Sequence, residues 1–131
     1  MLLPLLFLAA ACSGGSSTSG PASSLSRPSS TGTIQIVSPT DGEVIRGSDV
    51  PVKVKLTGAK VVAATTTNIV ADEGHLHLTL DGEVVSMNFS TTDTLTDVSP
   101  GIHTLQVEFV ASDHLPFDPR VIEQVTFQVK P

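Results

Sequence analysis

The stretch HLHLTLDGEVVSMNF, residues 75–89, carries the clearest evidence for the fold. In residues 75–80, leucines alternate with polar side chains, which is the two-residue period of a β-strand buried on one face. Asp81-Gly82 then gives a strong hairpin signal, and residues 83–89 are predicted to form the returning strand. Within the first strand, three leucines are expected to face the core and three polar residues to face outward: Leu76, Leu78 and Leu80 inward, His75, His77 and Thr79 outward.

The rest of the chain repeats this pattern of short strands separated by turns. In residues 50–56, every second residue from Val50 to Leu56 is apolar, with two lysines on the other face. Residues 102–110 place His103, Leu105, Val107 and Phe109 on one face. Further strands are predicted at residues 33–37 and 120–129 and near Leu95, with an irregular segment at 57–74 and a loop at 111–119 containing Pro116 and Pro119. No segment has helical periodicity. About seven short strands predict an all-β fold, an antiparallel β-sandwich, and a chain with 1 cysteine has no internal disulfide.

The first 12 residues, MLLPLLFLAAAC, have the composition of a secretory signal. Three alanines precede Cys12, as in a bacterial lipoprotein signal. Leu8 lies one position further from the cysteine than is usual in such signals, and no Lys or Arg precedes the apolar run. The alternative, a transmembrane anchor, needs about 20 apolar residues. We therefore expect Cys12 to carry a lipid.

Residues 13–32 consist almost entirely of Ser, Gly, Thr, Pro and Ala. Such a segment has too little apolar surface to offset the entropy lost on ordering, so a flexible tether is expected. Residues 33–131 then form one folded domain. This order of segments predicts a lipid-anchored domain in the bacterial cell envelope, outside the cytoplasmic membrane, and leaves open whether the inner or the outer membrane holds it.

Composition and motifs narrow the class of function. The formal net charge is −6, with no Trp and no Tyr, which argues against nucleic-acid binding. No nucleophile elbow, phosphate-binding loop or zinc-protease motif occurs, so the chain is predicted not to be an enzyme. The expected partners are the membrane, through the lipid, and an envelope protein.

Four stretches carry a family resemblance. IQIVSPTDGEVIRGSDVPVKVKL at 34–56 and SPGIHTLQVEF at 99–109 resemble the opening and the penultimate strand of bacterial immunoglobulin-like domains. Together with the PGIHTLQVEF part of the latter, EGHLHLTLDGE at 73–83 and DHLPFDPRV at 113–121 resemble an uncharacterised family of secreted bacterial domains. That family has a GHHHLLIDG and PGxHTLxLxF pattern, followed by a loop with histidine and proline. The resemblance implies an immunoglobulin-like sandwich and an envelope location, and no particular activity. Leu76 stands where that pattern has a middle histidine.

The histidines are the main candidates for chemistry. In such a sandwich, strands 75–80 and 102–110 are antiparallel neighbours, which would bring His75, His77 and His114 to one end. Glu108 shares the outward face of the neighbouring strand. Further acidic candidates at this end are Asp72, Glu73, Asp113 and Asp118. Three histidines and a carboxylate would suit zinc or copper. The alternative is that these are solvated surface side chains, with Glu108 paired across the sheet.

Two other residues are given structural roles. His103 follows Pro100-Gly101 at the corner where related sandwiches place a hydrogen-bonded tyrosine, and it is expected to bond in the same manner. Met87 is expected to pack in the core or on the sheet rather than to bind copper. The leading prediction is a lipid-anchored binding or structural module of unknown partner, and the alternative is a copper- or zinc-binding envelope protein.

Overall fold

The computed structural model describes residues 26–131, so the predicted signal and Cys12 lie outside the described residues. Nine strands make up this part of the chain: β1 (Thr33–Ser38), β2 (Val44–Arg46), β3 (Val50–Thr57), β4 (Lys60–Val61), β5 (Glu73–Leu80), β6 (Glu83–Asn88), β7 (Thr92–Leu95), β8 (Gly101–Ala111) and β9 (Pro116–Lys130). Within residues 26–131 there is no helix long and apolar enough to cross a membrane.

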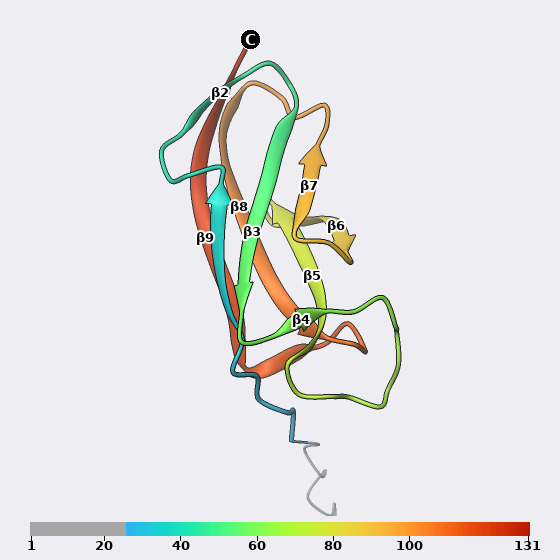
Figure 1. Ribbon diagram of the computed structural model, residues 1–131. Helices are drawn as coiled ribbons and strands as arrows, with labels where there is room; N and C mark the ends of the chain where they lie inside the picture. Colours follow the sequence, from blue (N-terminus) through green and yellow to red (C-terminus); the bar gives the residue numbers. More distant parts are fainter. Residues whose placement is uncertain (1–25) are drawn as a thin grey trace, which may run out of the picture.

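The strands form two sheets that face each other as the layers of a sandwich (Figure 1). One sheet has the order β1-β3-β7. The other has the order β2-β9-β8-β5-β4, and β6 also pairs with β5. The pairs β5–β8 and β8–β9 are antiparallel. The predicted antiparallel β-sandwich is therefore confirmed, with two short parallel pairs, β2–β9 and β4–β5, added at its margins.

The core lies between the two sheets and follows the alternation in the sequence. β3 buries every second residue, and so does the half of β9 near its end. β5 contributes Leu76 and Leu78, and β8 contributes Leu105, Val107 and Phe109, all of them fully or almost fully buried. Burial of these side chains is the main favourable term in folding, at roughly 25 cal/mol for each Å² of apolar surface removed from water.

Two elements differ from the predictions. The predicted loop at 111–119 is wrong in its second half, because β9 begins at Pro116. Proline fits there because β2 pairs with β9 only from Gln128 on, so the first half of β9 is an edge where no N–H need be donated. β2, at Val44–Arg46, was not predicted, since three residues are too few to show a period.

The segment before β1 also differs, because it is attached to the domain rather than free. The guanidinium of Arg27 bonds both carboxylate oxygens of Asp113, at 2.7 and 2.9 Å, and the carbonyl of Pro116. The Pro28 carbonyl accepts the Asp118 N–H at 2.9 Å. The expected tether reached to residue 32, whereas residues 27–32 are held on the domain by these polar contacts, which a hydrophobicity argument does not consider.

Candidate functional site

His75, His77 and His114 form a group that we call the histidine cluster. Its position depends on the close contact between β5 and β8. Gly74 is paired with Ala111, and a Cβ atom added at Gly74 would overlap the carbonyl oxygen of Val110. Only glycine allows the two backbones to come so close. His75 is the next residue, so this close approach of the two backbones fixes the position from which the His75 side chain projects.

His75 is buried, with 0% of its surface exposed. Its side chain lies on the outward face of β5, opposite Leu76, as the alternation predicts. It is covered there rather than solvated, because Phe89, His114 and the carbonyl of Ala64 lie against its ring. The Phe89 ring meets it edge-on at 4.8 Å between centroids. Its Nε2 lies 3.1 Å from the Ala64 carbonyl oxygen. Burial lowers the pKa of His75 because the charged form would lose its hydration.

His77 and His114 complete the cluster. His114 sits in the turn between β8 and β9 with a φ of 63°. Its Nδ1 lies 3.0 Å from His77 Nε2, and its Nε2 lies 3.3 Å from the Thr65 hydroxyl. The centroid of its ring is 4.3 Å from that of His75 and 5.3 Å from that of His77. Burial and the neighbouring His114 lower the pKa of His77. The structure thus brings together the three histidines singled out in the sequence.

Four of the five acidic candidates are engaged elsewhere, and the fifth, Asp118, is exposed. Glu108 is buried, and both of its oxygens accept hydrogen bonds from Arg120, at 2.7 and 2.6 Å. Arg27 likewise binds Asp113 and lowers its pKa. Glu73 pairs with Lys60, and Asp72 accepts bonds from Ser30 and Thr31. As the side chains stand in residues 26–131, no three or more His, Cys, Asp or Glu residues are arranged to hold a metal ion.

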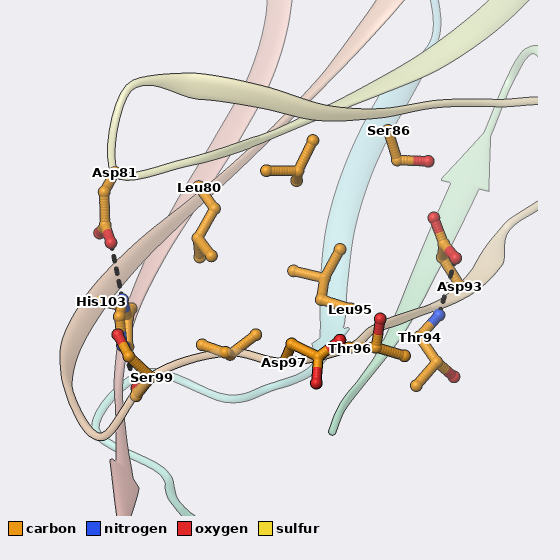
Figure 2. Close-up of a pocket in the computed structure, with 12 residues that line it drawn as sticks. Leu80, Asp81, Ser86, Asp93, Thr94, Leu95, Thr96, Asp97, Ser99 and His103 are labelled. Carbon is orange, nitrogen blue, oxygen red and sulfur yellow. Dashed lines mark hydrogen bonds and ion pairs between the residues drawn. The ribbon is translucent and has the colours of Figure 1, made fainter. Parts of the chain in front are cut away.

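At the opposite end of β5, His103 of β8 lies beside a surface hollow of about 490 Å³. Figure 2 shows Asp81 and His103 joined at one side of this hollow, at 2.6 Å between Asp81 Oδ2 and His103 Nδ1. His103 Nε2 donates to the Ser99 carbonyl at 2.7 Å. Nδ1 therefore joins the start of β8 to the β5–β6 turn, and Nε2 joins it to the β7–β8 connection, which is the behaviour of a structural residue.

β6 presents apolar side chains to solvent at the edge beside the cluster. Met87 is 58% exposed, so the expectation that it packs in the core or on the sheet is wrong. It is paired with His77 across β5 and β6. Four apolar side chains are exposed here: Val84, Val85, Met87 and Phe89.

Several residues of the cluster had no signal in the sequence. Thr65 and the Ala64 carbonyl come from the irregular segment 57–74, whose path no periodicity predicts. Arg120 follows a proline and gave no sign of pairing with Glu108. Phe89 could have been inferred, because it lies two residues beyond Met87 and such residues share a strand face.

The sequence matches no family model and no curated protein. Solved structures match the fold. The fibronectin(III)-like modules of CbhA from Clostridium thermocellum are similar over 75% of this chain and 96% of that chain, with 19% identity and a TM-score of 0.56. The PKD domain of human KIAA0319 is similar over 90% of this chain and 93% of that chain, with 20% identity and a TM-score of 0.50. The domain therefore has an immunoglobulin-like fold.

Proposed function

We propose that this protein is a lipid-anchored binding module of the bacterial cell envelope and not an enzyme. Three features support the proposal: an apolar segment ending in small residues before Cys12, a Ser- and Gly-rich segment after it, and an immunoglobulin-like sandwich. The fold itself, which resembles solved fibronectin(III)-like and PKD domains, carries the binding role, because such sandwiches present edges and loops to other proteins.

The surface best suited to a protein partner is β6. Among residues 26–131 this strand pairs with β5 alone, so its other edge is not paired with a strand of this part of the chain. Valine, methionine and phenylalanine side chains are exposed along it. An extended segment of an envelope protein could add a strand there, with backbone hydrogen bonds for affinity and the apolar side chains for specificity.

Fractionation tests the anchor. We expect the parent protein in the membrane fraction, and Cys12→Ala either in the soluble fraction or as an uncleaved precursor. Ser13→Ala, at the next position, serves as the matched control and should fractionate as the parent. If Cys12→Ala is processed and fractionates like the parent, the anchored module is wrong.

We propose metal binding at the histidine cluster as a second candidate function. One observation favours it: Nδ1 of His75 is buried and has no hydrogen-bond partner among residues 26–131. A buried polar atom left unpaired costs about 1–3 kcal/mol, so its retention calls for a reason such as a ligand. Calorimetry with zinc and copper tests the proposal. Heat of binding that is unchanged by combining His77→Ala with His114→Asn would exclude the site.

A further inference from the structure

We infer that the histidine cluster is a site for monovalent copper, Cu(I), ligated by His75 Nδ1, His77 Nε2 and His114 Nδ1, with the Met87 thioether as the fourth donor. The inference rests on the proposed metal-binding function and deepens it, because it names the ion and the donor atoms. Four features support it: the tautomers of the histidine rings, the distance between the ring nitrogens of His77 and His114, the absence of uncompensated negative charge on the donors, and the position of Met87 on the neighbouring strand.

The tautomer of His75 is set by its surroundings. A carbonyl oxygen only accepts, so the Nε2 that lies 3.1 Å from the Ala64 oxygen must carry the proton. Nδ1 of the neutral ring is then a bare lone pair, buried and without a partner in residues 26–131. A second ring nitrogen donating to a backbone carbonyl is the usual arrangement that orients a metal-binding histidine.

His114 is prepared in the same way. Its Nε2 can donate to the Thr65 hydroxyl, which leaves Nδ1 as a lone pair that accepts the N–H of His77. These two nitrogens lie 3.0 Å apart. Two nitrogens that share one ion at bond lengths of 2.0–2.1 Å and a tetrahedral angle lie about 3.4 Å apart. The two rings therefore need to move apart by only a few tenths of an ångström to admit the ion. The proton on His77 Nε2 moves to Nδ1 of the same ring, so binding releases no net proton.

Charge favours a monovalent ion. The three nitrogen donors are neutral. Two carboxylates beside them are already paired: Arg120 binds Glu108, the register partner of His77, and Arg27 binds Asp113. The Phe89 ring, the His114 ring and the Ala64 carbonyl lie against His75, which is 0% exposed. The cost of desolvating an ion grows steeply with its charge, so an uncompensated divalent ion is disfavoured here relative to Cu(I).

The neighbouring strand supplies a soft donor. Met87 on β6 is the register partner of His77 on β5, so their side chains leave the same face of the sheet. Its side chain is free to turn, because it is largely exposed rather than packed. A thioether is a ligand that selects Cu(I) over zinc. Exposure of such a large apolar side chain beside three histidines is accounted for by this role.

Competition with chromogenic chelators measures the two affinities separately. The full chain is used with Cys12→Ser, so that no thiol binds copper. We expect the parent to bind one Cu(I), and Met87→Leu to weaken Cu(I) binding by about tenfold while zinc affinity is unchanged. His114→Asn should weaken Cu(I) by about 100-fold, and asparagine keeps the left-handed turn. His103→Gln, at the other end of the domain, is the matched control and should bind as the parent.

The outcomes separate the two proposals. If neither ion binds, or if His114→Asn binds both as the parent does, metal binding at this cluster is wrong altogether. If zinc is bound more tightly than Cu(I), or if Met87→Leu leaves Cu(I) affinity unchanged, the metal site stands but its assignment to Cu(I) with Met87 is wrong. Circular dichroism of each variant checks that it has kept the all-β fold.

Discussion

At the scale of single residues, the histidines show how environment sets function. His103 and His75 both occupy strands of one sheet, yet their surroundings shift their pKa values in opposite directions. Asp81 accepts from His103 and raises its pKa, whereas burial lowers the pKa of His75. The first ring is suited to be charged and structural, the second to remain neutral and offer a lone pair.

The His103–Asp81 pair should make stability depend on pH. The folded pKa of His103 is raised above its unfolded value of about 6.5, so its contribution is complete below that pH and is lost as pH rises through the folded pKa. Hydrogen bonds from the Thr104 N–H and from His103 lower the pKa of Asp81, whose contribution is lost only as pH falls below about 3.8. The pair therefore stabilises most in the interval between these values.

Urea unfolding of the parent and of His103→Gln measures this dependence. We expect the difference in unfolding free energy between the two proteins to be larger at about pH 5.5 than at about pH 8.5. The lowered pKa values of His75 and His77 act in the opposite direction, but they are common to both proteins and cancel in the difference. Equal differences at the two pH values would show that folding does not raise the pKa of His103.

The sequence predicted that His75 lies near His77 and His114, but not that it is buried. The two-residue spacing on a strand places His75 and His77 on one face, and strand pairing brings His114 near them. What covers His75 depends on the path of residues 62–72 and on the β6 side chains. Neither has a period in the sequence, since that path is set by tertiary contacts such as Thr66 N–H to the Ser112 carbonyl.

At the scale of elements, β8 is the centre of its sheet, with β5 on one side and β9 on the other. Alternation over 102–110 was enough to predict this strand and its inward face, because a central strand must bury one set of side chains. β2 and the start of β9 were not predicted. These segments have no alternating pattern of apolar residues, and they are strands because their backbones pair with a neighbouring strand.

Leu105 tests the inward face of β8. Its side chain is 0% exposed between the two sheets, so Leu105→Ala should reduce the free energy of unfolding by about 2–5 kcal/mol. Ile102→Ala on the same strand is the control, because Ile102 is 73% exposed and its removal should cost less than about 0.5 kcal/mol. A loss below about 1 kcal/mol for Leu105→Ala would mean that this face is poorly packed.

Gly74 tests the contact between β5 and β8. Gly74→Ala would drive a methyl group into the Val110 carbonyl, so the two strands must separate at this point. We expect a loss of about 1–3 kcal/mol in urea unfolding and faster amide exchange near Ala111. Parent-like stability and exchange would show that β5 can move away from β8 without cost, and would remove the geometric basis for the position of His75.

At the scale of the whole molecule, residues 27–32 join the predicted tether to the sandwich. Composition alone could not predict this attachment. One arginine and a few hydroxyl and carbonyl groups make it, in a segment that has too little apolar surface to fold by itself. The folded domain therefore begins before the first strand, at about Arg27.

Arg27→Ala should free this segment. Without the Asp113 pair, the Pro28 carbonyl should lose its hold on the Asp118 N–H, and exchange of that amide should accelerate. Arg46→Ala removes an equal charge from exposed β2, at the other end, and should leave this amide unchanged. Unaltered exchange at Asp118 in Arg27→Ala would show that the segment is held by something other than the guanidinium.

The Arg27–Asp113 bond also determines from which end of the sandwich the N-terminal segment leaves. Asp113 is next to His114, so the chain leaves the sandwich at the histidine end, while Lys130 lies at the far end (Figure 1). Only 15 positions separate Arg27 from Cys12, a reach of at most roughly 50 Å. With a lipid on Cys12, the histidine end of the sandwich would be the end joined to the bilayer, and the opposite end would be the one farther from this attachment. Copper would then be exchanged most readily with a protein embedded in that same membrane, and less readily with a carrier diffusing in from the opposite side.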